Sequence, residues 1–258
     1  MLLAILVRRG VSKFFGLLMD CPASRIFIRG FIKRNNIEMD EYTTTKYKSF
    51  NAFFVREIKK EVRHFPDCEQ DLAAPCDGKL TAYPITADSA FHIKKSVYTI
   101  DGLLREKELA DEFIDGTCLI FRLTPNDYHR YSYIDDGEVL CRKRIKGVLH
   151  TVRPISQHRY NIYAQNTREY TIMQTKNFGK VIQIEVGALF VGRVKNYMAE
   201  GSFQRGDEKG VFEFGGSTIV LLFQKDAVTI DDAICTNTQQ DKETVVRMGY
   251  TIGLRGSR

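Results

Sequence analysis

The chain has 258 residues, 43% of them hydrophobic and 27% charged, which is the composition of a folded globular protein and excludes an intrinsically disordered chain. No stretch approaches the roughly 20 apolar residues of a membrane-spanning helix, and residues 1–7 are too short an apolar run for a secretory signal. The net charge of +6 is N-terminal, because residues 1–66 contain 13 Lys and Arg against 6 Asp and Glu, a surplus of 7. A basic segment that also contains many apolar residues favours contact with an anionic membrane surface over nucleic acid.

Six cysteines are spread along the chain without a CxxC pair or the spacing of a metal site. A chain of this length can bury a core without a disulfide framework. We therefore expect reduced thiols, most of them packed, in a cytoplasmic protein with no bound metal.

Two amphipathic helices are expected at the N-terminus. Apolar residues recur at near-helical spacing over residues 2–19, and Cys21-Pro22 ends the pattern. A second segment mixes aliphatic, aromatic and basic side chains: Ile26, Phe27, Ile28, Phe31, Ile32, Arg25, Arg29, Lys33 and Arg34. This mixture is typical of a helix at a membrane interface, and the alternative is a pair of helices packed on the protein's own core.

A third helix is expected after Ser49, a residue type that favours the N-cap position. Its apolar side would carry four residues: Phe50, Phe53, Phe54 and Ile58. Taken by itself, this is a docking helix with a solvated basic face.

Beyond Pro66 the sequence changes to short strands separated by turn signals. The turns are expected at Asp77-Gly78, Asp101-Gly102, Asp115-Gly116, Asp136-Gly137 and Gly179. Within residues 181–194, Ile182 and Ile184 alternate with Gln183 and Glu185, which predicts a strand with one buried and one polar face. Residues 236–243 are polar enough to predict a loop. The whole pattern predicts an α+β fold, with a helical, membrane-associating region at residues 1–66 and a β-rich, sandwich-like or barrel-like catalytic domain at residues 67–258.

The most informative stretch is residues 210–223, where a short strand meets Gly215, Gly216 and Ser217 and then continues into a buried apolar strand. Glycine has no side chain, so a neighbouring group can approach the Gly216 carbonyl closely. Ser217 is well placed to attack that carbonyl. The alternative is a bulge or tight turn whose serine only bonds to the backbone.

Three further motifs contain residue types used in catalysis and binding, and each also has an ordinary structural explanation. Asp77 lies in Ala-Pro-Cys-Asp-Gly, where a turn aspartate often bonds its own backbone. His129 lies in Pro-Asn-Asp-Tyr-His-Arg, and a lone loop histidine is often structural. Arg168 lies in Asn-Thr-Arg and would hold an acidic group by two hydrogen bonds or form a surface salt bridge.

These motifs occur in one order over residues 49–225, and together they resemble the phosphatidylserine decarboxylase family. The resemblance rests on a Phe-Phe-x-Arg helix, Pro-x-Asp-Gly, Pro-x-Asp-Tyr-His-Arg, Val-Gly-Ala-x-x-Val-Gly and a Gly-Ser-Thr segment. It implies that Ser217 attacks Gly216, that the chain cuts itself between them, and that Ser217 becomes a pyruvoyl group. The products would be a β chain of residues 1–216 and an α chain of 258 minus 216, or 42, residues.

The resemblance also implies the reaction. The pyruvoyl group, the only cofactor expected, would form a Schiff base with the amine of phosphatidylserine and accept electrons as CO2 leaves, giving phosphatidylethanolamine. Asp77 and a histidine would activate the Ser217 hydroxyl, and His129 would return a proton to the substrate's α-carbon. Arg168 is the candidate substrate-binding residue.

The chain departs from the family at Ser132, where a second relay histidine is expected. A serine hydroxyl is not a base near neutral pH, so His129 would do both jobs, or His150 would replace the missing base. His64, His92 and His158 complete the five histidines. The loss at Ser132 leaves a non-catalytic membrane-binding relative open, and a relative acting on another serine-headed lipid would share the same residues.

The expected partners follow from this resemblance and from the basic, apolar N-terminus. They are a phospholipid substrate, a membrane surface and the two chains of one precursor, without nucleic acid, and the sequence allows a homodimer. The expected location is peripheral, on the cytoplasmic face of the cell membrane.

Overall fold

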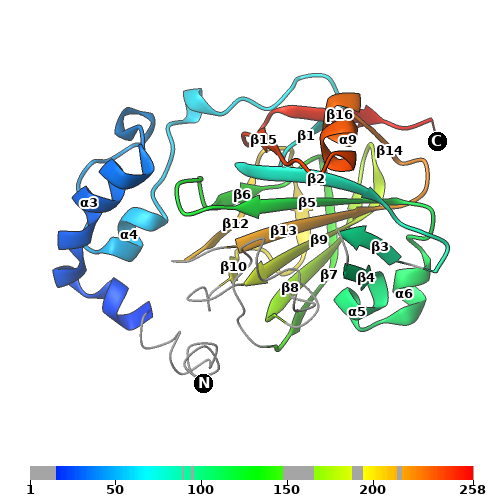
Figure 1. Cartoon of the computed structure of the whole chain (residues 1–258), viewed down its shortest axis with the longest axis horizontal. Helices are drawn as coiled ribbons and strands as arrows, with labels where there is room; N and C mark the ends of the chain where they lie inside the picture. The colour runs from blue at the N-terminus through cyan, green and yellow to red at the C-terminus, as the bar shows by residue number, and fades with distance from the viewer. Residues whose placement is uncertain are drawn as a thin grey trace.

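The computed structural model describes residues 16–88, 90–93, 96–147, 166–187, 194–213 and 217–257. Helices at the N-terminal end stand beside a body built of antiparallel strands (Figure 1). The predicted α+β class is therefore confirmed. Within these residues the largest sheet is open and does not close into a barrel.

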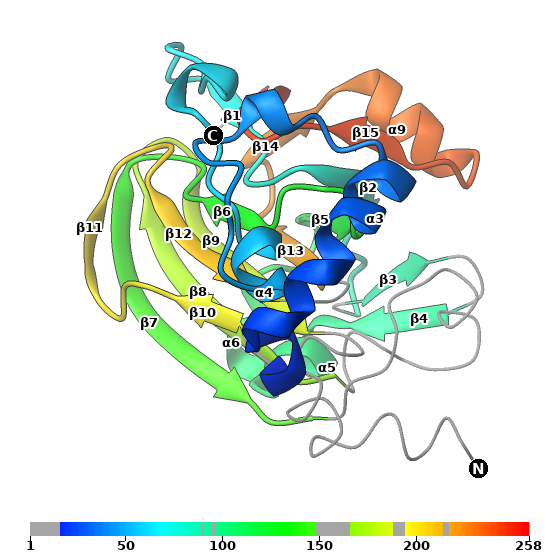
Figure 2. The ribbon, with the colours of Figure 1, turned by 90° about the vertical axis from the view of Figure 1, so that its left-hand side faces the viewer.

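The N-terminal region is helical where it is described, and the helices contact one another through apolar side chains. The elements are η1 (Pro22–Arg25), α3 (Ile26–Asn35), η2 (Met39–Glu41), α4 (Phe50–Phe54) and η3 (Lys60–Val62). The predicted stop at Cys21-Pro22 is confirmed, because the helical residues 16–20 end there. Phe31 of α3 packs edge-on against Phe50 and Phe53 of α4, which joins the two helices (Figure 2).

Helix α4 begins as predicted but is shorter. The Ser49 hydroxyl accepts a hydrogen bond from the Ala52 amide at 3.1 Å, which confirms the N-cap. The helix ends at Phe54, so the prediction that Ile58 continues its apolar side is wrong. Ile58 instead forms an antiparallel bridge with Tyr42, because backbone pairing between these two segments replaces the next helical turn.

The large sheet has eight strands in the order β11-β7-β8-β9-β13-β5-β2-β15, with each neighbouring pair antiparallel. In that order the strands are Gly201–Phe203, Gly137–Ile145, Arg168–Thr175, Gly179–Gly187, Ser217–Phe223, Thr117–Leu123, Gly78–Pro84 and Thr244–Val246. Three smaller sheets accompany it: β10 (Val194–Asn196), β12 (Glu208–Phe212) and β6 (Arg130–Ser132); β1 (Asp71–Ala73), β16 (Thr251–Arg255) and β14 (Val228–Ile230); β3 (Ala90–Ile93) and β4 (Ser96–Thr99).

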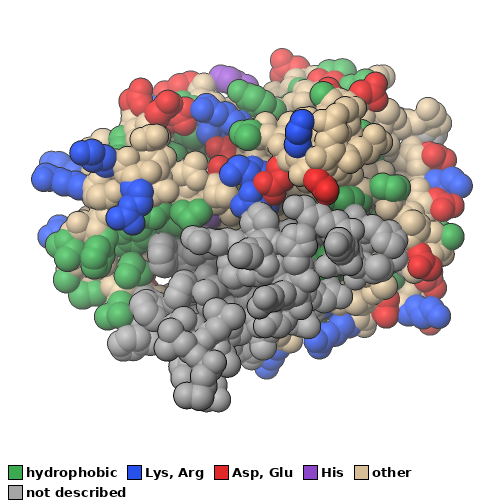
Figure 3. All heavy atoms as spheres, viewed as in Figure 1, with side chains coloured by type: hydrophobic (Ala, Val, Ile, Leu, Met, Phe, Trp, Pro, Cys, Tyr) green, Lys and Arg blue, Asp and Glu red, His purple; other side chains and the backbone are tan. Residues whose placement is uncertain are grey.

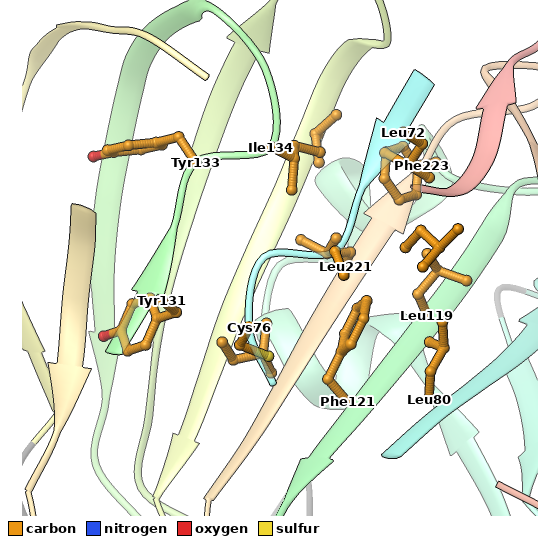
Figure 4. Packing of buried hydrophobic residues seen from close by; sticks show 14 of the residues in the cluster. Leu72, Cys76, Leu80, Leu119, Phe121, Tyr131, Tyr133, Ile134, Leu221 and Phe223 are labelled. Carbon is orange, nitrogen blue, oxygen red and sulfur yellow. The ribbon is translucent and has the colours of Figure 1, made fainter. Parts of the chain in front are cut away.

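Strand β13 lies in the middle of the large sheet, between β9 and β5, and every residue of it is buried. Ile219 and Leu221 pack with Phe121 on one face, where β6 and β12 also contribute to the core (Figure 4). Val220 and Leu222 pack on the other face, against residues of α5 (Ile100–Leu104) and α6 (Lys107–Asp111). Because both faces of β13 are covered, apolar residues follow one another along the strand without alternating with polar ones. The prediction of a buried strand is therefore confirmed.

Strand β9 is also covered on both faces, so the prediction that one of its faces is exposed and polar is wrong. Gln183 and Glu185 are completely buried, because the layer containing β12 covers that face. Lys209 of β12 donates to Glu185 Oε1 at 2.7 Å, so the buried carboxylate is paired.

Two turn or loop predictions are also wrong. Asp101-Gly102 lies inside α5, where Thr99 caps the helix by accepting from the Gly102 amide at 3.0 Å. Residues 236–239 belong to α9 (Asp232–Gln239), which Asp231 caps through the Ala233 amide. In both cases a helix N-cap outweighs polar or turn-forming composition.

Candidate active site

Ser217 is the first residue of β13 and is fully buried. It pairs in register with Leu123 at the end of β5 and with Gly187 at the end of β9. These strand ends lie at the side of the large sheet that faces α4 (Figure 1). Gly216, on the other side of the bond expected to break, lies outside the described residues.

His129 is the residue that the fold brings to Ser217. Its Nδ1 lies 3.3 Å from Ser217 Oγ, although 88 residues separate the two in sequence. Both side chains are 0% exposed, and the imidazole lies against the ring of Phe54 with centroids 4.1 Å apart. Ser217, the predicted nucleophile, and His129, one of the two histidines considered as its base, are therefore in contact.

The second imidazole nitrogen indicates which tautomer is present. His129 Nε2 lies 3.2 Å from the carbonyl oxygen of Thr124. A carbonyl only accepts hydrogen bonds, so Nε2 carries the proton and Nδ1 has a free lone pair for the Ser217 hydroxyl. This is the tautomer that a general base toward Ser217 needs.

The surroundings of His129 also keep it uncharged. Burial is the main cause that lowers its pKa to about 3, and the charge of Arg56 lowers it further, while the Thr124 carbonyl acts in the opposite direction. The imidazole is therefore neutral near pH 7 and able to accept a proton.

Asp77 is buried close to the same loop but has other partners. Arg63 donates to its two carboxylate oxygens at 3.1 and 2.7 Å, and the Met248 amide donates to Oδ1 at 2.8 Å. This two-point ion pair joins η3 to the start of β2. The relay role of Asp77 stays a prediction.

Ser132, at the position of the missing relay histidine, is buried at the end of β6. Its hydroxyl lies 3.1 Å from Met248 Sδ, and its amide donates to the Pro75 carbonyl. Ser132 and Asp77 thus both contact Met248, Ser132 at the side-chain sulfur and Asp77 at the backbone amide. His150, the alternative base, lies outside the described residues and stays a prediction.

Arg168 is not a surface residue, so the surface salt bridge considered for it is wrong. Its buried guanidinium donates to the carbonyls of Leu103, Gly102 and Asn166 at 2.6, 2.7 and 3.1 Å. Burial lowers the pKa of Arg168 to about 10. The residue ties β8 to α5, and its substrate-binding role stays a prediction.

Three residues near the site received no role from the sequence. Asn166 donates to the Gly187 carbonyl at 2.8 Å, directly across from Ser217. Thr124 orients His129 through a backbone carbonyl, which no side-chain pattern reveals. Arg56 had a signal, since it is the arginine of the Phe-Phe-x-Arg motif.

Among the described residues, no helix has the length and apolar character needed to cross a bilayer. The cysteines are free thiols: Cys76 and Cys118 are buried, Cys141 and Cys235 are half-buried, and Cys21 and Cys68 are exposed. The expectation that most of the cysteines are packed is therefore confirmed, because four of the six are buried or half-buried.

Comparison with known proteins identifies the family. A family model described as phosphatidylserine decarboxylase matches residues 50–254. The chain is 50% identical over 226 residues to phosphatidylserine decarboxylase proenzyme 2 of Clostridium acetobutylicum, covering 88% of this chain and 77% of that protein. It is 40% identical to the phosphatidylserine decarboxylase proenzymes of Clostridium novyi, over 95% of this chain and 84% of that protein, and of Ruminiclostridium cellulolyticum, over 97% and 86%. The chain therefore belongs to the phosphatidylserine decarboxylase family.

Proposed function

We propose that this chain decarboxylates phosphatidylserine to phosphatidylethanolamine and matures by cutting its own backbone between Gly216 and Ser217. The observation that carries the proposal is the 3.3 Å contact between Ser217 Oγ and Nδ1 of a neutral His129. A buried serine needs an adjacent base to become a nucleophile, and this histidine has the tautomer that the role requires.

In the proposed cleavage, His129 Nδ1 takes the hydroxyl proton as Ser217 Oγ attacks the Gly216 carbonyl carbon. The peptide C–N bond breaks and its nitrogen gains a proton, which leaves residues 1–216 as an ester on Ser217. Removal of the α-proton of residue 217 then expels the Gly216 carboxylate. Hydrolysis of the resulting dehydroalanine releases ammonia and leaves a pyruvoyl group at the start of residues 217–258.

The fold supports retention of the short chain after cleavage. β13 is paired along its whole length with β9 on one edge and β5 on the other. Both neighbours belong to residues 1–216, so the 42-residue chain, 258 minus 216, would stay as the central strand.

The residues around position 217 fit a pyruvoyl group, because the position is buried and Gly187 across from it has no side chain. The group would supply a carbonyl that accepts the electrons released as CO2 leaves the substrate. His129 would return a proton to the substrate's α-carbon. The negative charge of a bound substrate would offset the positive charge of Arg56. This would raise the pKa of His129 toward the range that the acid role needs.

Membrane docking is the second part of the proposal. Ile28, Phe31 and Ile32 of α3 pack inward, while Ile26 and Phe27 are 76% and 54% exposed. Figure 3 shows hydrophobic side chains at this end of the molecule with Lys and Arg beside them. Apolar side chains flanked by basic ones suit a peripheral site on an anionic membrane, where each basic residue contributes about 1 kcal/mol.

We expect the double variant Ile26→Ser with Phe27→Ser to bind phosphatidylserine vesicles at least about tenfold more weakly than wild type, because each apolar side chain loses about 2 kcal/mol of burial. Vesicle cosedimentation measures this. The matched control is Val245→Ser with Leu254→Ser, which removes two exposed apolar side chains from β15 and β16. Equal binding by the two double variants would rule out α3 as the docking surface.

The function itself is tested by incubating purified protein with phosphatidylserine vesicles and measuring phosphatidylethanolamine and CO2. We expect both products, and a short chain lighter than residues 217–258 by the elements of ammonia. An intact chain without either product would favour the non-catalytic relative. Product from another serine-headed lipid alone would change the substrate but keep the chemistry.

A further inference from the structure

Arg56 is a buried cation that the mechanism above uses only through its charge. The residue is 2% exposed and lies two positions after the end of α4. Its guanidinium carbon lies 4.5 Å from the centre of the Tyr42 ring and 5.1 Å from that of Phe53. In the described part of the chain it forms no ion pair with a carboxylate, and its Nε has no hydrogen-bond partner. An arginine buried without a counter-ion is costly, so its neighbours are informative.

Those neighbours are the backbone groups around His129. Arg56 donates to the carbonyls of Asn126 and Asp127, both at 3.4 Å, and to the Phe54 carbonyl at 3.5 Å. Asn126 and Asp127 form the turn that begins at Thr124, and Phe54 is the ring against which His129 lies. The guanidinium therefore connects both walls of the histidine's pocket.

The turn itself holds the Thr124 carbonyl in place. That oxygen accepts from the Asp127 amide at 2.9 Å as well as facing His129 Nε2 at 3.2 Å. The Asp127 carboxylate accepts from the Thr124 amide and hydroxyl at 2.5 and 2.7 Å, which closes the turn. Arg56 adds the contacts that fix this turn against α4.

We propose that the Thr124 carbonyl, held by Arg56, is the third member of the proton relay in this chain and takes the orienting role expected of Asp77. A base in a nucleophilic relay needs a third group that fixes its tautomer and direction. The Thr124 carbonyl contacts His129 and meets that need, whereas the hydrogen bonds of Asp77 go to Arg63 and Met248. Arg56 is a positioning residue, because it acts through the turn.

The charge of Arg56 also affects the protonation state of His129. A carboxylate beside His129 would raise the pKa of the imidazole, whereas the nearby guanidinium lowers it. Within the described residues, the charged side chains on either side of His129 in the sequence already have partners: Asp127 accepts from Thr124, and Arg130 is paired with Glu57 and Glu208. The arrangement keeps His129 neutral near pH 7 but also makes it a weaker base, so the rate gain expected from Arg56 comes from positioning the turn.

The test compares the rate and the pH profile of self-cleavage in three variants: Arg56→Met, Arg56→Lys and Asp77→Asn. It rests on the proposed function, because it needs a chain that cuts itself. Arg56→Met keeps an apolar stem but loses the charge and the donors, so we expect cleavage about 10- to 100-fold slower, with its acid limb at higher pH. Arg56→Lys should restore the pH profile and part of the rate. Asp77→Asn keeps an acceptor for the Met248 amide but breaks the ion pair with Arg63, so circular dichroism first establishes that the variant is folded. We then expect folded Asp77→Asn to cleave faster than Arg56→Met and to keep the pH profile of wild type.

A second measurement does not need activity. In the uncleaved Ser217→Ala chain, nitrogen NMR of His129 should show the Nε2–H tautomer and no protonation down to about pH 4, and adding Arg56→Met should move its titration to higher pH. An Nδ1–H tautomer, or folded Asp77→Asn that fails to cleave while Arg56→Met cleaves normally, would overturn the proposal. A wild type that never cleaves would contradict the proposed function, while the NMR result would still decide the tautomer.

Discussion

Ser217→Ala is expected to remain a single chain of 258 residues, whereas wild type yields residues 1–216 and 217–258. The alanine has no hydroxyl to attack the Gly216 carbonyl, and the strand around it should be unaffected because β13 is fixed by its neighbours on both edges. Intact-mass measurement separates the two outcomes. Without a new N-terminus there is no pyruvoyl group, so decarboxylation should be lost as well.

The control is Ser132→Ala, which removes a buried hydroxyl from the same neighbourhood. Ser132 contacts Met248 and does not contact His129 in the described structure, so this variant should still cleave. If Ser217→Ala still cleaves, or if folded Ser132→Ala does not, the hydroxyl of Ser217 is not the nucleophile of self-cleavage.

His129→Asn is expected to slow self-cleavage by about 10² to 10⁴, the usual contribution of a general base. Asparagine can still bond to Ser217 but cannot take its proton. The comparable change at an exposed histidine, His64→Asn, should have no effect. Time courses on denaturing gels measure both rates.

The pH dependence of self-cleavage follows from the direction in which the pKa of His129 is shifted. The pKa of His129 is lowered from 6.5 to about 3, so the imidazole stays unprotonated as pH falls through the ordinary histidine range. We therefore expect the wild-type cleavage rate to be flat from about pH 8 to about pH 5 and to decline only below that. A midpoint near 6.5 would mean that another histidine, such as His150, is the base.

Ser217 and His129, which lie in contact at the candidate site, could be singled out from local motifs, but their contact could not be predicted. Ser217 stands out because two glycines precede it and an apolar strand follows, and His129 stands out within its polar loop. Their 3.3 Å contact depends on β13 pairing with β5, which places the turn after β5 over the start of β13. Pairing between distant strands cannot be deduced from either segment alone.

Glu185 and Asp77 show why the remaining details were missed. Alternation along β9 predicts a solvated Glu185, but a second layer covers that face and supplies Lys209. The motif around Asp77 predicts a relay acid, which stays a prediction, but it gives no sign that Arg63, 14 residues earlier, pairs with the Asp77 carboxylate. In each case a partner from another element decides the environment of a charge.

By itself, the sequence determined the α+β class, the Ser49 cap and the buried strand that begins at Ser217, and it named Ser217 and His129 as candidates for the site. These features depend on side-chain type, short-range periodicity and the conformations that adjacent residues allow. Only the tertiary structure decided that the Thr124 carbonyl faces His129, that Arg63 pairs with Asp77, and that burial lowers the pKa of His129. The physical reason is that hydrogen-bond partners and desolvation are set by segments far apart in sequence, which meet only when the chain is folded.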